Sequence, residues 1–358
     1  LLPLAVAGLA ACSLVPPAAV PDAGLAAAPF TVTGTVSGAP VAGNGGRLDG
    51  FPELAALVRA SLAANADLRV AYATLDRVRA AAAEARALRL PQTTLESSLR
   101  FDDRATQPGV NSLPSTDFDA VAAAGWDVDL FGRLRSAALA SSADADAAAA
   151  AYEGLRQAIV AETVGAYLDH CGARQAAAAL AAAVAAQERL AATLGRQRAA
   201  GEVSGLEVAQ ARAALGNLRA GLPVLAAAGA AARYRLAELQ GRPPAAELPL
   251  RCPVVPRFDG PLPAGDGQAL LLRRPDIREA DRRLAAATAR IGVARAELYP
   301  RLNLGGAVGF ITGGLVADAT PFLSWSFPNQ GPARARIAHA EAGGRAALAA
   351  WDATVLRA

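Results

Sequence analysis

The sequence predicts a mainly α fold, in which long coiled-coil α-hairpins are combined with four antiparallel strands in an internal repeat. Three observations predict this fold. Apolar residues make up 53% of the 358 residues but aromatic residues only 5%, because alanine dominates. Alanine is the best helix former, so this composition favours long, closely packed helices over a large globular core. The other two observations are a proline-free stretch from Ser136 to Ala200 and a self-similarity at an offset of 209 residues.

The first residues predict a secretion signal. Residues 1–11 form an apolar run that ends in small residues directly before Cys12. This run is typical of a signal peptide and is shorter than the about 20 residues that a membrane-spanning helix needs. Since the sequence contains no Met, we expect its basic start to lie upstream of Leu1. Leu9-Ala10-Ala11-Cys12 resembles a bacterial lipobox and predicts lipidation of Cys12; the alternative is an ordinary signal peptide with an incidental Cys. Ser13 in place of Asp favours the outer membrane.

A linker and two helices are predicted next. Residues 12–50 are rich in Pro, Gly and Ala and show no periodicity, which predicts a lipid-anchored linker. Residues 51–90 then follow a helical period, with Leu54, Leu57 and Val58 at spacings of three and four. The Asn-Ala-Asp sequence at 65–67 interrupts this pattern. We expect Asp67 to be the N-cap of a second helix that ends before Pro91.

The period changes to two after Pro91. Residues 93–101 and 118–131 alternate apolar and polar side chains, with a polar loop between them. About ten residues is the length of a tilted strand that crosses an outer membrane. The alternative for each strand alone is a soluble hairpin. Trp126, near a strand end, fits an interfacial aromatic girdle or, equally well, packing where the strand meets the following helix.

A long helical hairpin follows. An unbroken helix over 136–200 would be roughly 95 Å long. Its acidic and basic residues recur too often for a membrane span. A break at 201–205 precedes a returning helix that runs to about Gln240, with Ser204 as its N-cap. Pro223 predicts a kink or a local break in that helix, and residues 242–267 are expected to be irregular.

The order of elements is predicted to occur twice. Residues 65–69 (NADLR) correspond to 274–278 (RPDIR), and Pro91 corresponds to Pro300. A Trp-x5-Gly-x2-Arg pattern starts at Trp126 and again at Trp325. We therefore divide the chain into repeat 1 (51–267) and repeat 2 (268–358). Repeat 1 continues into a long hairpin, whereas the sequence ends 27 residues after Gly331, so we expect most of the second hairpin to be missing.

Residues that could carry chemistry are few. His170 and His339 are the only histidines, so no catalytic residue, metal site or cofactor is predicted. Net charge is +3 with both signs interspersed, which gives no indication of nucleic-acid binding. Like Asp67, Asp276 lies at a predicted helix start and is interpreted as a helix cap rather than as a functional acid.

Two further cysteines lie in the helical region and the irregular segment that follows it. Cys171 lies about 30 residues before the predicted hairpin tip, and the returning helix ends about 37 residues after the tip. At 1.5 Å per residue, both points lie at a similar distance from the tip. Cys252 follows shortly after. A Cys171–Cys252 disulfide and two buried free thiols are equally compatible with this placement.

Several segments together resemble one family. Residues 271–278 (LLRRPDIR), 286–294 (AATARIGVA) and 129–133 (DLFGR), with the pattern Gly201-x2-Ser204-x-Leu206-x-Val208, resemble the outer-membrane efflux protein family. Within it, the sequence is most similar to the TolC-like outer-membrane factors of the resistance-nodulation-division (RND) lipoprotein branch. The resemblance implies a trimeric α/β-barrel tube. Each protomer would give four strands to a small membrane β-barrel and long helices to a periplasmic tube.

The resemblance also implies a function. The protein would be the lipid-anchored outer-membrane channel of a tripartite efflux system, conducting drugs or small molecules passively from a periplasmic adaptor and an inner-membrane RND pump. Gly201, Val203 and Ser204 would contact the adaptor; the alternative is that they only turn the chain. Two other functions stay open, namely the outer-membrane channel of a type I protein-secretion system and a structural periplasmic coiled-coil lipoprotein.

Overall fold

The computed structural model describes residues 36–37, 50–102, 115–252, 255, 262–263, 273–311 and 314–357. Cys12, the predicted signal peptide and most of the predicted linker lie outside these residues. The chain divides into two compact units. Unit 1 contains Thr74–Ala151 and Gly267–Ala358, and unit 2 contains Tyr152–Asp266 and the stretch that ends at Ala73. The sequence division at 267/268 follows chain order instead and stays a prediction.

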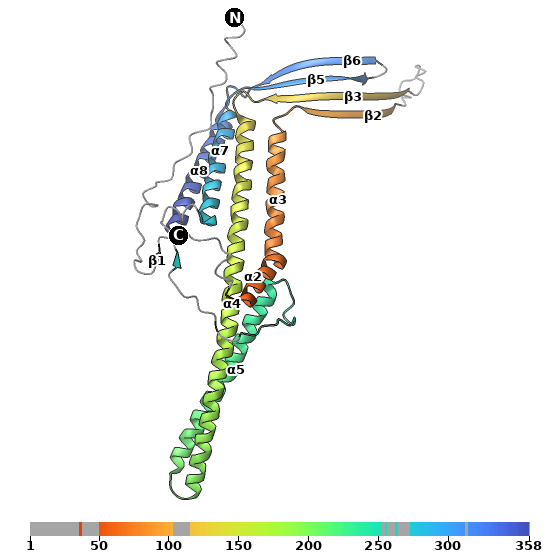
Figure 1. Cartoon of the computed structure of the whole chain (residues 1–358). Coiled ribbons are helices and arrows are strands. Elements are labelled where there is room, and N and C mark those ends of the chain that lie inside the picture. Colours follow the sequence, from red (N-terminus) through yellow and green to blue (C-terminus); the bar gives the residue numbers. More distant parts are fainter. Residues whose placement is uncertain are drawn as a thin grey trace, which may run out of the picture. The chain divides into compact units, whose positions relative to one another are not determined.

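Unit 1 contains the same order of elements twice (Figure 1). In the first copy, the order is α3 (Ala66–Ala87, which begins in unit 2), β2 (Gln92–Asp102), β3 (Ser115–Val128) and α4 (Arg133–Ala199, which continues into unit 2). In the second copy, it is α7 (Pro275–Ala296), β5 (Arg301–Ile311), β6 (Gly314–Ser324) and α8 (Gly331–Arg357). The long helices and the four predicted strands are confirmed.

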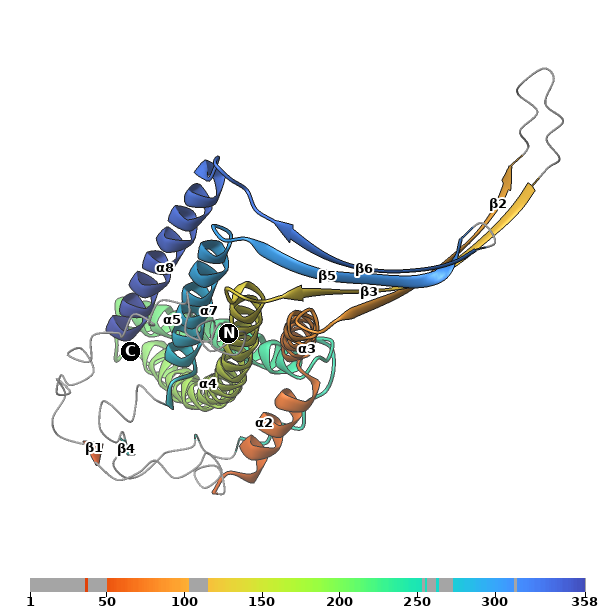
Figure 2. The ribbon, with the colours of Figure 1, turned by 90° about the horizontal axis from the view of Figure 1, so that it is seen from above.

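The four long strands form one antiparallel sheet in the order β2-β3-β5-β6. The two copies are joined by β3 and β5, whose register runs from Ala120 opposite Phe310 to Val128 opposite Leu302. Seen from above, the strands lie side by side in a curved layer (Figure 2). Among the described residues, β2 and β6 are its edges.

The core of unit 2 joins α2 (Pro52–Ala64) to α4 and α5 (Gly205–Leu239). Its buried residues are Leu54, Leu57, Val58, Ala166, Tyr167, Cys171 and Leu236. Each fully buried Leu stabilises the fold by about 2 kcal/mol. A two-residue parallel pair, β1 (Val36–Ser37) and β4 (Leu262–Pro263), also belongs to this unit.

Two helix-cap predictions need correction. The amide of Leu68 donates to Asn65 Oδ1 at 3.0 Å, so Asn65 caps α3 and Asp67 lies within its first turn. Arg274 is the N-cap residue of α7, and Asp276 lies one residue beyond Pro275. There the Asp276 carboxylate accepts from the amide of Ile277 at 3.0 Å. Both aspartates are therefore placed to interact with the positive end of a helix without being its N-cap.

Of the two expectations for Pro223, a kink or a local break, the structure excludes the break, and the kink stays a prediction. α5 runs from Gly205 to Leu239 with Pro223 inside it, so the chain is not broken at that proline. A proline inside a helix lacks the amide donor and its ring crowds the carbonyl of residue i−4, but packing against a neighbouring helix can outweigh this cost. Leu236 and Ala237, fully buried at the far end of α5, show where such packing is tight.

Candidate functional site

The four-stranded sheet has two chemically different faces. Successive side chains of a strand point to opposite faces, and residues opposite one another in the register share a face. The register places Leu95 opposite Ala122, Ala122 opposite Val308, and Val308 opposite Ala317. All four therefore lie on one face, which we call the apolar face.

The apolar face carries no charged side chain among the described residues. Its members are Thr93, Leu95, Ser97, Leu99, Phe101, Phe118, Ala120, Ala122, Ala124, Trp126, Val128, Leu302, Leu304, Gly306, Val308, Phe310, Leu315, Ala317, Ala319, Pro321 and Leu323. Several large members are well exposed in the single chain; Leu95 is 80% and Phe101 74% exposed. Such a surface in water would favour association, whereas hydrocarbon would solvate it.

The opposite face, called the polar face here, carries all the charged strand residues whose side chains are described. These residues are Glu96, Arg100, Asp119, Asp127, Arg301 and Asp318. Between them lie small residues such as Ala123, Gly125 and Gly305. A sheet that is apolar on one side and polar on the other is the pattern of a wall that separates lipid from water.

Each copy closes its strand-to-helix junction with a tryptophan. Trp126 Nε1 donates to the carbonyl oxygen of Arg89, just beyond α3, at 3.0 Å. Trp325 Nε1 donates to the carbonyl oxygen of Leu298, just beyond α7, also at 3.0 Å. Both bonds satisfy a carbonyl that a helix end leaves without an intrahelical partner. Of the two roles open for Trp126, junction packing is thus the one that a contact supports.

The DLFGR segment forms the start of α4. Asp129 accepts from the amides of Leu134 at 3.0 Å and of Arg135 at 2.7 Å. Gly132 has φ +75°, a left-handed conformation that glycine adopts without strain. Arg133 pairs with Asp127 at the end of β3, so the segment links the polar face of the sheet to the helix.

The hairpin tip is built by two helix caps. α4 ends in a Schellman motif, in which Gly201 N donates to Arg198 O at 3.0 Å and Glu202 N to Gln197 O at 2.9 Å. Gly201 has φ +82°, which explains the glycine at this position. α5 begins with a capping box, in which Ser204 N donates to Glu207 Oε2 at 2.7 Å and Glu207 N to Ser204 Oγ at 3.4 Å.

These caps determine the electrostatics of the tip. Hydrogen bonds from the backbone and the side chain of Ser204 lower the pKa of Glu207 below its ordinary value. Ser204-x-x-Glu207 is a capping-box pattern that is visible in the sequence, although only Ser204 was predicted as a cap. Ser204 therefore has a structural role, and so does Gly201.

Two apolar side chains of the tip, Val203 and Leu206, take no part in the hydrogen bonds of the caps. Leu206 is 66% exposed, and Val203 is partly exposed, whereas Val208 is buried. An exposed apolar side chain gains free energy when a partner covers it and removes it from water. Val203 and Leu206 are thus the tip residues best placed for a contact with another protein.

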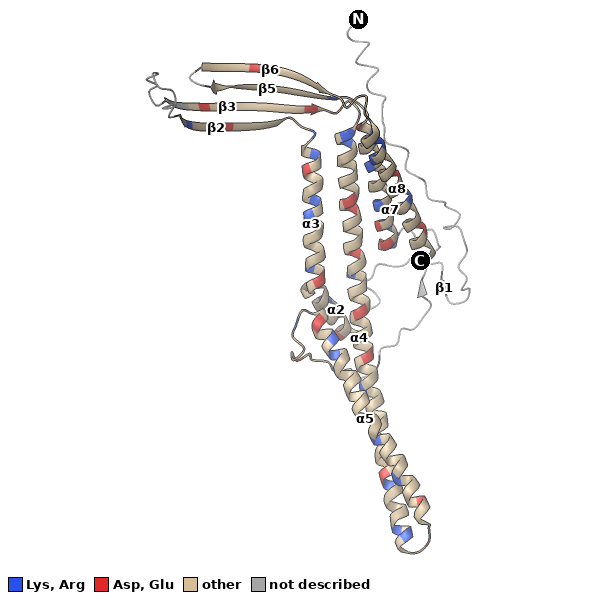
Figure 3. Cartoon of the chain, turned by 180° about the vertical axis from the view of Figure 1, so that it is seen from behind, with Lys and Arg blue, Asp and Glu red and all other residues tan. Residues whose placement is uncertain are grey.

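Polar contacts hold α4 and α5 together along the hairpin. They join Gln187 to Ala211 O at 3.1 Å, Glu188 to Arg219 at 2.6 Å, His170 to Gly229 O at 2.9 Å, and Glu162 to Arg235. Figure 3 shows that charged residues recur along both helices. Because these bonds lie at several levels, the register of the hairpin is fixed by polar pairs as well as by alanine packing.

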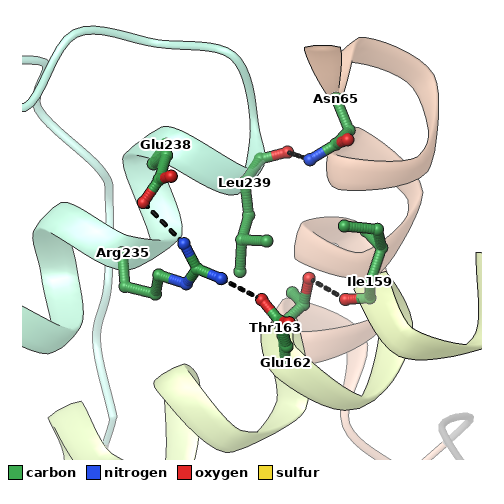
Figure 4. Close-up of polar contacts among 7 residues, drawn as sticks. All are labelled: Asn65, Ile159, Glu162, Thr163, Arg235, Glu238 and Leu239. Atoms are coloured by element: carbon green, nitrogen blue, oxygen red, sulfur yellow. Dashed lines mark hydrogen bonds and ion pairs between the residues drawn. The ribbon is translucent and has the colours of Figure 1, made fainter. Parts of the chain in front are cut away.

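The most connected of these contacts lies where α3 begins (Figure 4). Arg235 donates to Glu238 at 2.7 Å and to Glu162 of α4, and these hydrogen bonds raise the pKa of Arg235. Nearby, Asn65 Nδ2 donates to Leu239 O at 3.1 Å. Asn65 thus caps α3 and also satisfies the end of α5.

Cys171 and Cys252 form a disulfide in the structure, with their Cα atoms 5.3 Å apart. The bond fastens the segment after α5 to the side of α4. Arg174 supports it by donating to the carbonyl oxygens of Leu250 at 3.3 Å and Arg251 at 3.2 Å. Cys252 has φ 41°, so the backbone bends sharply where the segment meets α4.

Glu53 of α2 completes this attachment. Its carboxylate accepts from the amide of Arg251 at 2.7 Å and from the Tyr167 hydroxyl at 3.3 Å. Burial and the adjacent Glu53 carboxylate raise the pKa of Tyr167 above 10.0. Glu53 was not predicted as part of this attachment, because no local sequence pattern connects residue 53 to residue 251.

The described residues offer neither a metal-binding cluster nor a membrane-spanning helix. No group of three or more His, Cys, Asp or Glu side chains in the described ranges is arranged to hold a metal ion. Among the helices of those ranges, none combines the length and the apolar character that a membrane crossing requires.

The sequence is similar to outer membrane proteins of known families. OprJ of Pseudomonas aeruginosa is 30% identical over 319 residues, covering 85% of this chain and 66% of that protein. The solvent efflux pump outer membrane protein SrpC of Pseudomonas putida is 29% identical, covering 81% of this chain. The match spans 64% of SrpC, which is less than two thirds of its length.

The fold is also similar to that of solved outer-membrane channels. The outer-membrane channel OprN superposes with a TM-score of 0.83 at 34% identity, covering 96% of this chain and 78% of that one. The family described as "Outer membrane efflux protein" matches residues 57–242 and 267–358, which include the sheet, both Trp junctions and the hairpin tip. The chain therefore belongs to the outer membrane efflux protein family.

Proposed function

We propose that the protein is the outer-membrane channel of a tripartite efflux system and that it passively conducts drugs or other small molecules out of the periplasm. The observation that carries this proposal is the two-faced sheet. A face of more than twenty residues without a charge suits lipid, and the opposite face suits a water-filled passage. The similarity to SrpC, a solvent efflux pump outer membrane protein, and to OprJ, an outer membrane protein, supports it.

The active form is proposed to be a homotrimer. β2 and β6 are the unpaired edges of the described sheet, and unpaired edges are not tolerated in hydrocarbon. Four strands cannot close a barrel alone, so copies must supply the missing neighbours. Cys12 is proposed to carry the acyl anchor, which places the protein in the outer membrane with its helices in the periplasm.

The hairpin tip is proposed to dock a periplasmic adaptor that connects the channel to an inner-membrane RND pump. Gly201 and Ser204 shape the tip, and Val203 with Leu206 offers the apolar contact. Val203→Glu should abolish efflux and leave the trimer yield unchanged, because Val203 makes none of the cap hydrogen bonds. Gly201→Glu is a poorer probe, since φ +82° strains any side chain. Loss of the trimer in Val203→Glu would count against the contact.

Photocrosslinking from position 203 of the full-length protein in cells tests the function, with the captured partner identified by mass spectrometry. Capture of an adaptor of a proton-driven efflux pump is expected. Capture of a secretion-system adaptor would reassign the protein to type I secretion. If no periplasmic partner is captured, a structural coiled-coil lipoprotein becomes the better interpretation.

A further inference from the structure

The repeated Trp-x5-Gly-x2-Arg pattern ends in an arginine whose role the fold leaves open. Trp126 and Trp325 close helix ends, and Gly132 takes the left-handed conformation at the turn into α4. The arginine of each copy, Arg135 in α4 and Arg334 in α8, is exposed. In the part of the chain that the structure describes, neither guanidinium has a hydrogen-bond or ion-pair partner. Their recurrence therefore has no explanation within the single chain.

The direction of Arg135 follows from its neighbours in α4. Arg133 pairs with Asp127, which lies on the polar face, so Arg133 points to that side of the sheet. Arg135 comes two residues later, which is roughly 200° around the helix axis, and it therefore points to the opposite side. Leu139, one turn further along the same side of α4, is 48% exposed. Arg135 thus lies on the side of the apolar face.

The second copy divides its arginines in the same way. Arg336 pairs with Glu297 and lines one cavity together with Arg301 of the polar face. Arg334 precedes Arg336 by two residues and points to the opposite side of α8. In each copy, one arginine of the first helical turn is paired on the polar side and another is exposed on the apolar side.

The exposed arginines do not serve the helix ends that carry them. Acids in the first turn stabilise a helix, because its N-terminal end is positive. α2, α3, α5 and α7 follow this rule with Glu53, Asp67, Glu207 and Asp276. Both α4 and α8 are described from their first residue, and neither has an acid in its first turn. Asp129, just before α4, accepts from backbone amides. The arginines are thus placed at some cost to their helices.

The arginines lie just beyond the end of the apolar face. Residues that pair across the strands form rows, and the last row of the apolar face beside the helices holds Val128, Leu302 and Leu323. Beyond it, Trp325 is 51% exposed and stacks on Phe327, with 4.8 Å between the ring centroids. Hydrocarbon that covers the apolar face ends at this level. Indole rings and arginines directly after an apolar surface are typical of the layer of lipid headgroups.

From this arrangement we infer that Arg135 and Arg334 bind the phosphate groups of anionic phospholipids in the periplasmic leaflet of the outer membrane. The inference rests on the proposed position of the sheet in the membrane and of the helices in the periplasm. A guanidinium can donate two parallel hydrogen bonds to phosphate oxygens, and the negative leaflet surface attracts its charge. Because both copies carry the site, it recurs around the closed barrel and fixes the height of the barrel in the membrane.

Native mass spectrometry of the full-length trimer in detergent tests the inference, with phosphatidylglycerol as the probe and phosphatidylcholine as the comparison lipid. The wild type is expected to retain phosphatidylglycerol in preference. Arg135→Gln with Arg334→Gln should weaken its binding about fivefold at each site. Arg135→Lys with Arg334→Lys should lose less, because the charge remains and only the two-pronged geometry is lost.

The matched control removes two arginines that are paired within their own helices. Arg79 pairs with Asp76 at 3.7 Å, and Arg156 pairs with Glu153 at 3.1 Å. Arg79→Gln with Arg156→Gln therefore changes the net charge by the same amount and should keep the wild-type affinity. A loss as large as that of the Arg135 and Arg334 variant would show that overall charge attracts the lipid, which overturns the sites.

The remaining outcomes separate the inference from the proposal beneath it. Equal retention of both lipids by the wild type overturns the headgroup sites. Displacement of the lipid by millimolar inorganic phosphate would identify a free anion as the ligand and overturn them as well. Planar-bilayer conductance of the same preparation tests the channel separately. A conducting trimer without lipid preference overturns the sites alone, whereas a trimer that does not insert overturns the membrane position of the sheet and the sites with it.

Discussion

Trp126 and Trp325 show how single residues connect the sheet to the helices. Each indole N–H closes a helix end in its own copy, at 3.0 Å in both. The two tryptophans occupy the same place in the repeat, so the same hydrogen bond forms in both copies. The Trp residues of the repeat pattern are therefore explained by the carbonyls that they satisfy.

Removing one indole N–H should weaken the protein measurably. Trp126→Phe keeps most of the ring but leaves the Arg89 carbonyl without this donor, so the free energy of unfolding should fall by about 1 kcal/mol. The thermal midpoint of the purified protein measures the change. Trp325→Phe should lower it less, because Gln330 Nε2 also donates to the Leu298 carbonyl at 3.3 Å; an unchanged midpoint in Trp126→Phe would show that water replaces the indole without loss.

Glu207 gives the hairpin tip a dependence on pH. Its pKa is lowered in the folded protein, so its contribution to stability is present above the ordinary value of 4.5 and is lost as the pH falls through the lowered pKa. Hydrogen exchange of tip peptides should therefore distinguish Glu207→Gln from the wild type at neutral pH. The two should converge in acid. A difference that persists at low pH would contradict the capping box.

At the scale of whole elements, the helical hairpin depends on its attachment to the segment that follows α5. The Cys171–Cys252 disulfide spans 81 residues of sequence, and the hydrogen bonds of Glu53 and Arg174 converge beside it. A covalent link across so long a loop restricts the unfolded chain strongly. The disulfide therefore acts on the stability of the unit as well as on the position of one segment.

Loss of this disulfide should be costly. Cys171→Ser with Cys252→Ser should lower the free energy of unfolding by roughly 4 kcal/mol. Without the cross-link, the unfolded chain regains the conformational entropy that the closed loop had restricted. Comparing thermal midpoints with and without reductant measures it. The double variant should be insensitive to reductant, and a wild type that is equally insensitive would contradict the prediction.

The elements themselves could be predicted to a large extent from the sequence. Changes of period and the prolines at 91 and 300 separate helices from strands, and the Gly and Ser residues at 201–205 place the tip. Local patterns were less reliable for choosing between neighbours. Asn65 and Asp67 are both good cap formers, and only the tertiary contact with Leu239 O shows why Asn65 is used.

The two faces of the sheet were harder to predict from the sequence, because they depend on the register of the four strands. Alternation indicates two faces for each strand, but which residues of different strands share a row follows only from the ladder. Asp318 and Glu96 are far apart in sequence and lie in adjacent rows. Long-range contacts such as Glu53 with Arg251 could not be predicted for the same reason.

The sheet gives a test at the scale of the whole molecule. Leu99 lies on the apolar face and Ser98 on the polar face of the same strand. Leu99→Arg should cost about 2–4 kcal/mol if that face meets the middle of the bilayer. Ser98→Arg, opposite Asp119, should be tolerated. The yield of heat-resistant trimer in outer-membrane fractions measures both, and equal yields would refute the assignment of the faces.

The pairing of β3 with β5 constrains how the protein is made. All of residues 129–300 lie between these two neighbours in the sheet, so the ladder that joins the copies cannot form until the whole hairpin has been synthesised and exported. During that interval β3 presents an open edge with apolar side chains, which is a hazard for aggregation. Closing so long a loop is also slow. We therefore expect the chain to be most prone to aggregation in the interval before β5 has been made.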